Sequence, residues 1–196
     1  MKMPYSEETW DRVAQGYEGG YDAIAERSKW VAPQVLTELA LPYLIRDSPI
    51  LDVGCGTGLS GAGFITQGFV LDGIDFSLEM CLQARKRGYQ KQIKAELTHS
   101  WDLGYLKQEM QGQYHNMISV GVYGESILAQ KFRFLFPLLN AKATVAVAGE
   151  ANAIEHIIDE DLQNYGFALC AEERSIAYTN RDLVPIEYLY LVAVRE

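Results

Sequence analysis

Two short apolar segments that each end in an aspartate most constrain how this chain folds. The first, residues 50–58, reads ILDVGCGTG, so an apolar run reaches Asp52 and glycines follow at alternate positions. The second, residues 70–75, reads VLDGID and ends in Asp75. A strand, a glycine-rich turn, a helix and a second strand with a terminal carboxylate form half of a nucleoside-binding α/β unit. The sequence therefore predicts a nucleoside site, with the carboxylate of Asp75 over the ribose.

The first segment also contains a literal dinucleotide pattern, because residues 56–61 read GTGLSG. A dinucleotide places its pyrophosphate at a helix N-terminus, and a carboxylate as close as Asp52 would repel it. A ligand with an ammonium group and no phosphate is compatible with that carboxylate, and S-adenosylmethionine is such a ligand. The residues therefore favour S-adenosyl-L-methionine as cofactor, with NAD as the alternative.

Composition limits the class of protein and its partners. The 196 residues suit one domain, and 48% of them are hydrophobic, which is ordinary for a globular chain. Three scattered cysteines make neither a disulfide framework nor a zinc site and favour a reducing cytoplasm. The sequence shows no membrane-length apolar run and no signal peptide. The net charge of −9 argues against a nucleic-acid partner and is compatible with a small or cationic substrate.

The spacing of apolar residues predicts alternating helices and strands followed by a β-hairpin. Residues 179–185, TNRDLVP, are too short a link for a helical crossover, so the last two strands should pair antiparallel. This order indicates an α/β fold with a doubly wound, mostly parallel sheet and one reversed strand. The expected strands are residues 49–53, 69–74, 92–97, 114–122, 143–148, 167–178 and 186–194.

Helices are predicted between these strands from apolar residues three and four apart. We expect a helix at 28–41, one that ends near Gln67, and one at 77–87 with Gly88 as its C-terminal glycine. Another should contain residues 127–135, and a capping box of Asn152 and Glu155 should open a helix that Gly166 ends. The side chains expected to face the core are Val31, Val35, Leu36, Leu39, Leu78, Leu82, Ile127, Leu128, Phe132 and Leu135.

Four segments resemble the class I S-adenosylmethionine-dependent methyltransferases, and the resemblance covers nearly the whole chain. ILDVGCGTG is similar to their first motif, GIDFSLEM at 73–80 to their second, and QYHNMISVGVYG at 113–124 to their fourth-strand motif. Residues 10–24, with 28–36 and 119–126, resemble more narrowly the small methyltransferases typified by the Williams–Beuren-region protein. The resemblance implies one Rossmann-like domain with a seven-stranded sheet, in which residues 1–45 are a helical lid and 46–196 the core.

The resemblance also implies the cofactor-binding residues. The alternate glycines would face the methionine moiety, Asp52 would order their loop, and Asp75 would accept from both ribose hydroxyls. Phe76 and Met80 would cover the adenine faces, and Glu96 with Leu97 would lie at the adenine edge. The expected cofactor-binding set is Asp52, Gly54, Gly56, Thr57, Gly58, Asp75, Phe76, Met80, Glu96, Leu97 and Gly121, and no metal is expected.

Candidates for the methyl-transfer step are Tyr17, Tyr123 and Glu125. Tyr17 matches a tyrosine that in the family lies near the reacting methyl group, and Tyr123 and Glu125 follow the fourth strand, beyond whose carboxyl end ligands sit. Relatives often carry Thr-His where this chain has Gly124-Glu125, so a family histidine base is missing there. The other polar candidates are expected to have structural roles or to lie in solvent: Cys55, His99, His115, His156 and residues 159–161.

The sequence therefore predicts a methyltransferase that acts on a small-molecule acceptor by in-line transfer. Methyl transfer from a sulfonium chiefly requires alignment, and a base only if the acceptor is protonated. The alternatives are a protein or peptide methyltransferase, a non-catalytic S-adenosylmethionine-binding protein, and an NAD-dependent oxidoreductase. The sequence leaves open whether the chain forms a homodimer.

Overall fold

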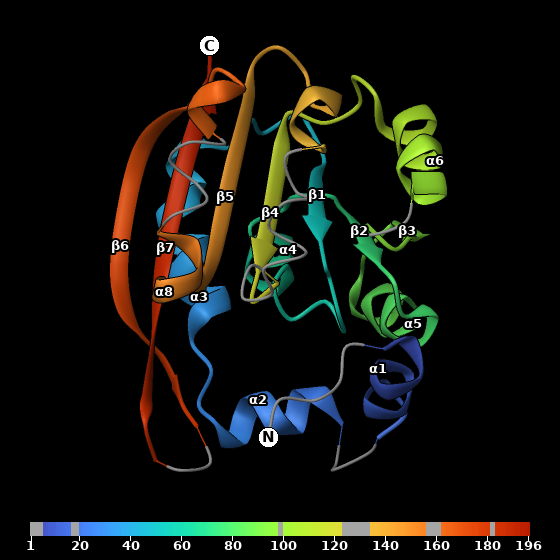
Figure 1. The fold of residues 1–196 in the computed structure, drawn as a ribbon, viewed down its shortest axis with the longest axis vertical. Helices are drawn as coiled ribbons and strands as arrows, with labels where there is room; N and C mark the ends of the chain where they lie inside the picture. Colours follow the sequence, from blue (N-terminus) through green and yellow to red (C-terminus); the bar gives the residue numbers. More distant parts are fainter. Residues whose placement is uncertain (1–5, 17–19, 98–99, 123–133, 156–161, 181–182) are drawn as a thin grey trace.

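A computed structural model describes residues 6–16, 20–97, 100–122, 134–155, 162–180 and 183–196, without the side chains of 100–103. The seven strands form one sheet in the order β3-β2-β1-β4-β5-β7-β6 (Figure 1). The first five are parallel, and β7 pairs antiparallel with both β5 and β6, so β7 is the reversed strand. The strands are β1 (Ile50–Val53), β2 (Leu71–Asp75), β3 (Lys91–Lys94), β4 (Asn116–Val120), β5 (Ala143–Glu150), β6 (Ala168–Thr179) and β7 (Pro185–Arg195).

Helices cover both faces of the sheet, as a doubly wound fold requires. On one face α3 (Ala32–Ala40), α4 (Ala62–Thr66) and α5 (Leu78–Arg87) share a core with Ile50 and Ile118. On the other, α6 (Ser100–Met110) and α8 (Ala151–Ile154) pack with Leu51 and Met117. Consecutive strand residues enter opposite cores, so the central strands β1 and β4 are buried on both faces. Short 3-10 turns lie at Leu41–Tyr43 and Phe136–Leu138.

The N-terminal segment lies apart from these layers. Helices α1 (Glu7–Ala14) and α2 (Tyr21–Arg27) lie beyond the carboxyl ends of the parallel strands (Figure 1). The side chain of Ser6 accepts from the N–H of Thr9 and caps α1. Residues 28–31 join the segment to the edge strand, since Val31 N–H donates to the carbonyl of Ala177. This arrangement puts two helices over the edge of the sheet where ligands bind in open α/β folds.

The predicted helix at 28–41 begins too early. Lys29 has φ of 54°, which no helix accommodates, and the helix starts at Ala32. Its buried residues are Ala32, Leu36, Thr37 and Ala40, whereas Val31 is 39% exposed, so its inward placement was wrong. The bond of Val31 to the neighbouring strand explains the later start, because it ties residue 31 to the sheet edge.

The inner face of α5 was also predicted wrongly. Ser77 caps this helix and Gly88, with φ of 116°, ends it, as expected. Leu78 and Leu82 are exposed, however, and Met80, Cys81 and Ala84 are buried. Residues two apart lie on nearly opposite faces of a helix, so a helix that buries Met80 must expose Leu78 and Leu82. The face of Met80 is turned toward the cavity.

Two further differences concern the C-terminal half. Helix α6 was not predicted, although Leu106 and Met110 on it are fully buried. The capping box was wrong, because Asn152 lies inside α8 and residue 150 precedes the helix without a side-chain cap. Leu135 is buried as expected, whereas Ile127, Leu128 and Phe132 lie outside the described residues. In the part of the chain that the structure describes, no helix combines the length and apolarity needed to cross a membrane.

Candidate active site

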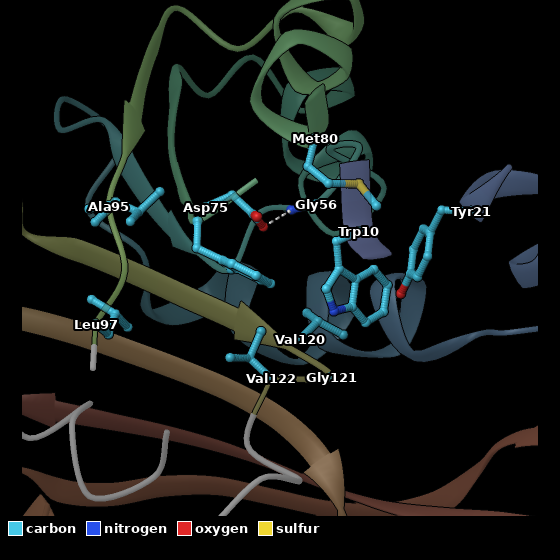
Figure 2. Close-up of a pocket in the computed structure, with 13 residues that line it drawn as sticks. Trp10, Tyr21, Gly56, Asp75, Met80, Ala95, Leu97, Val120, Gly121 and Val122 are labelled. Atoms are coloured by element: carbon cyan, nitrogen blue, oxygen red, sulfur yellow. Dashed lines mark hydrogen bonds between the residues drawn. The ribbon is translucent and has the colours of Figure 1, made fainter. Parts of the chain in front are cut away.

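A cavity opens at the carboxyl ends of β1, β2 and β4, beneath α1 and α2 (Figure 2). It contains most of the residues that the sequence assigned to the cofactor, which arrive from four separate segments. Asp52, Thr57, Gly58 and Glu96 are not among the residues that line it. The expected residues that do line it are Gly54, Gly56, Asp75, Phe76, Met80, Leu97 and Gly121.

Asp75 holds the two loops of the cavity together. Its Oδ2 accepts from the N–H of Gly56 at 2.9 Å, and its Oδ1 accepts from the N–H of Ser77 at 2.9 Å. Burial raises the pKa of Asp75 to about 6, against the effect of these N–H groups and that of Phe76. A carboxylate has four lone-pair sites, so Asp75 has acceptor capacity left for the hydroxyls of a bound ribose.

The alternate glycines serve different purposes. Gly56 has φ of 51° and nothing within 4 Å of the place where a Cβ would stand, so its backbone borders open cavity. Gly58 has φ of 85°, but a Cβ there would come within 2.9 Å of Tyr89 and 3.2 Å of Ala84. Gly58 therefore allows the loop to pack against α5, and Gly56 allows a ligand to approach the backbone.

Asp52 lies beneath the glycine loop, where it is fully buried. Its Oδ2 accepts from the hydroxyls of Ser60 and Tyr89, each at 2.5 Å. Burial raises the pKa of Asp52 to about 6, although these two hydrogen bonds favour the ionised form. Asp52 therefore connects the end of β1 to Ser60, at the end of the glycine loop, and to Tyr89, after α5. It does not line the cavity.

Thr57 binds the N-terminal segment. Its Oγ1 donates to Oδ1 of Asp22 at 2.5 Å, and its carbonyl accepts from Nε of Arg87 at 3.0 Å. Arg87 also forms an ion pair with Asp22. A residue expected to contact the cofactor thus connects the glycine loop to α2 and to the end of α5.

Two aromatic residues that sequence reasoning did not assign to the site cover the cavity. Trp10 of α1 and Tyr21 of α2 both line it, with ring centroids 6.0 Å apart in an edge-to-face arrangement. Tyr21 also packs edge-to-face on Trp30, at 6.1 Å. The signal in the sequence was the aromatic content of the segment, but it did not distinguish which rings face inward.

The residues proposed for the methyl-transfer step cannot be placed. Tyr17, Tyr123 and Glu125 lie outside the described residues, and so do His99, His156 and residues 159–161. His115 lies just before β4, at the other end of the sheet, with Nδ1 2.5 Å from the carbonyl of Lys142. Cys55 is buried behind the glycine loop. Among the residues that the structure describes, no cluster of His, Cys, Asp or Glu could hold a metal ion.

Comparisons with known proteins agree with this site. A family model described as a methyltransferase domain matches residues 50–125, which include the glycine loop, Asp75 and Gly121. The matched residues supply every part of the cavity wall except the N-terminal segment. A comparison with curated proteins finds no match.

Solved structures share the fold of this chain. One belongs to the complex between the Haloferax volcanii Trm112 methyltransferase activator and a methyltransferase, with a TM-score of 0.68 and 12% identity, over 98% of this chain and 99% of that one. An S-adenosylmethionine-dependent methyltransferase from Anabaena variabilis has a TM-score of 0.63 and 13% identity, over 100% and 98%. The magnesium protoporphyrin IX methyltransferase from Synechocystis with bound S-adenosylhomocysteine gives 0.62 and 17%, over 95% and 92%. These likenesses show that the chain shares the fold of these proteins.

Proposed function

We propose that this chain is an S-adenosylmethionine-dependent methyltransferase, which transfers the methyl group to a small-molecule acceptor by in-line displacement. Support for this class of enzyme and for S-adenosyl-L-methionine as its cofactor comes from the methyltransferase-domain model over residues 50–125 and from the fold shared with a methyltransferase that holds S-adenosylhomocysteine. When bound, the cofactor supplies a methyl group on a sulfonium, which is already an activated leaving group. The protein therefore has to bind, orient and shield the reactants, and alignment can contribute roughly 7–11 kcal/mol.

The observation that carries the small-acceptor proposal is the cover over the cavity. Trp10 and Tyr21 close the side that faces away from the sheet, so an acceptor has to fit beneath two aromatic rings. A bulky surface, such as a folded protein or an RNA helix, would require this cover to move. The net charge of −9 also disfavours an RNA acceptor.

We infer that, of the expected lid at residues 1–45, α1 and α2 act as the lid and rest on the cofactor loops, whereas α3 packs in the core on one face of the sheet. Asp22 contacts Thr57 and Arg87, as described above, and Oδ1 of Asp11 accepts from Oγ of Ser77 at 2.5 Å. The lid thus bonds to the loops that follow β1 and β2, which are also the loops that bind the cofactor.

Tyr17, Tyr123 and Glu125 are proposed to line the acceptor side. Their positions in the sequence support this proposal. Tyr123 directly follows Gly121 and Val122 of the cavity wall, and Tyr17 lies between α1 and α2 in the sequence. We further propose a cytoplasmic enzyme of the Williams–Beuren-region type without nucleic-acid or membrane partners. Homodimer formation can be checked by light scattering.

Incubation with methyl-labelled S-adenosylmethionine and a metabolite extract tests the acceptor class. We expect a labelled small product and formation of S-adenosylhomocysteine. Label in protein or RNA alone would replace the small-molecule proposal with the corresponding macromolecular one. A thermal shift with NAD, and none with S-adenosylhomocysteine, would contradict the cofactor as well.

A further inference from the structure

The indole nitrogen of Trp10 is a hydrogen-bond donor without an acceptor. Nε1 is buried, and none of the described residues accepts a hydrogen bond from it. In Figure 2 this nitrogen is on the edge of the ring that is turned away from Tyr21. A buried N–H without a partner is costly, and an indole N–H can only donate. A molecule bound in the cavity could therefore supply the acceptor atom that Nε1 of Trp10 lacks.

The helix that carries Trp10 is held in place on both sides of it. Glu7, one turn earlier, forms an ion pair with Lys94 at the end of β3. Asp11, the next residue, accepts from Ser77 at the start of α5. These two contacts to different elements of the core orient α1 and, with it, the indole N–H of Trp10.

The position of Trp10 along the cavity indicates which part of the ligand it meets. Ala95 and Leu97 lie at one end of the cavity, Trp10 and Tyr21 at the opposite end, and Asp75 between them (Figure 2). The ribose of S-adenosylmethionine lies between its adenine and its amino-acid part. If the ribose binds Asp75 and the adenine extends toward Leu97, the amino-acid part extends toward Trp10.

We propose that the indole N–H of Trp10 donates a hydrogen bond to the carboxylate of the amino-acid part of S-adenosylmethionine. This inference rests on the assignment of the cofactor. No lysine, arginine or histidine is among the described residues that line the cavity, so no basic side chain there neutralises that carboxylate. A hydrogen bond to an ionised oxygen is the strongest that a neutral indole can form. Trp10 then selects ligands that keep the carboxylate and couples the position of α1 to cofactor binding.

The test combines Trp10→Phe with two ligands that differ in one group. S-adenosylhomocysteine carries the carboxylate, and S-adenosyl-3-thiopropylamine lacks it but keeps the adenosine, sulfur and amine. Trp10→Phe keeps an aromatic ring and removes the N–H. Measured by calorimetric titration, we expect the substitution to weaken S-adenosylhomocysteine about tenfold to a hundredfold. It should change the affinity for the thiopropylamine by less than about threefold.

Trp30→Phe is the matched control, since Trp30 packs against the same Tyr21 but does not line the cavity. We expect this variant to bind both ligands like the original protein. Equal losses for both ligands in Trp10→Phe would show that Trp10 contributes only packing, and unchanged affinity for both would show that its N–H does not meet the carboxylate. Either result overturns the proposal. Failure of the unsubstituted protein to bind S-adenosylhomocysteine would instead overturn the cofactor site.

Discussion

The hydroxyl of Thr57 donates a hydrogen bond of 2.5 Å to Asp22, so the glycine loop is bonded to a helix 35 residues earlier in the chain. Arg87 reinforces this contact through an ion pair with Asp22 and a hydrogen bond to the carbonyl of Thr57. Asp22 therefore links the N-terminal segment, the glycine loop and the end of α5.

Replacement of Asp22 by alanine should loosen the lid without unfolding the core. The ion pair is half exposed, so we expect a loss of about 1 kcal/mol from it and the Thr57 hydrogen bond together. This corresponds to about fivefold weaker binding of S-adenosylhomocysteine in calorimetric titration. Glu26→Ala removes an exposed acidic side chain from the same helix and should leave the affinity unchanged. Equal losses of affinity in the two variants would show that the negative charge on α2, and not the contacts of Asp22 with Thr57 and Arg87, affects binding.

Asp75→Ala should weaken S-adenosylhomocysteine by tenfold to a few hundredfold. The substitution removes charge-assisted hydrogen bonds to the ribose, each worth about 1.5–3 kcal/mol before solvent recovers part of this. Calorimetric titration of the folded variant measures the loss. Asp72→Ala is a matched control on the same strand: Asp72 is also buried and accepts from Tyr114 and the N–H of Lys91, away from the cavity. It should reduce stability but not affinity, and an unchanged affinity in Asp75→Ala would exclude the proposed ribose site.

Gly56→Ala should abolish cofactor binding at a small cost in stability. The position has positive φ and open space around it, so strain costs about 1–2 kcal/mol, while the added methyl group enters the cavity. Gly68→Ala is the matched control, because Gly68 also has positive φ (84°) and open space but does not line the cavity. Chemical denaturation should show similar losses for both, and only Gly56→Ala should fail to bind S-adenosylhomocysteine.

Asp52 should make stability fall as the pH rises from about 4 to about 6. Burial raises the pKa of Asp52 from 3.8 to about 6, so in this window the folded state holds a proton that the unfolded state releases. The free energy of unfolding then falls with pH by up to about 1.4 kcal/mol per unit, and Asp75 contributes in the same direction.

Asp52→Asn removes one of these two titrations and should reduce the slope. Urea denaturation between pH 4 and pH 7 measures it in both proteins. The same slope in the variant would show that Asp52 titrates equally in the folded and unfolded states. Binding of S-adenosylhomocysteine should strengthen over this range, because ribose hydroxyls donate better to an ionised Asp75.

The sheet and the cofactor loops could be predicted because their signals are local. The carboxylates of Asp52 and Asp75 end buried strands, and the glycines between them suit a turn that only small residues allow. Helix faces were harder to predict: Leu78 and Leu82 have the right spacing but are exposed, because the face of α5 that carries Met80 and Ala84 is the buried one. The periodicity of apolar residues indicates that a helix has a buried face, but tertiary packing decides which residues form it.

The cover of the cavity could be predicted only in outline. The family resemblance implied a lid within residues 1–45, but the contacts that orient it join residues far apart in the sequence, such as Asp11 with Ser77 and Asp22 with Thr57. Trp10 gave no separate signal, since its significance depends on an unpaired nitrogen that only the folded arrangement shows.

The contacts of α1 and α2 with the cofactor loops have a consequence for the life of the protein in a cell. The polar contacts of these helices with the core are made to Lys94, Ser77, Thr57 and Arg87, and several of them are partly exposed, so we expect the helices to detach more readily than the sheet does. A bound ligand that touches Trp10 holds them down, and proteases then find fewer accessible bonds near the N-terminus. We therefore expect S-adenosylhomocysteine to slow brief trypsin digestion of the N-terminal segment, which would link the lifetime of the intact protein to the supply of its ligand.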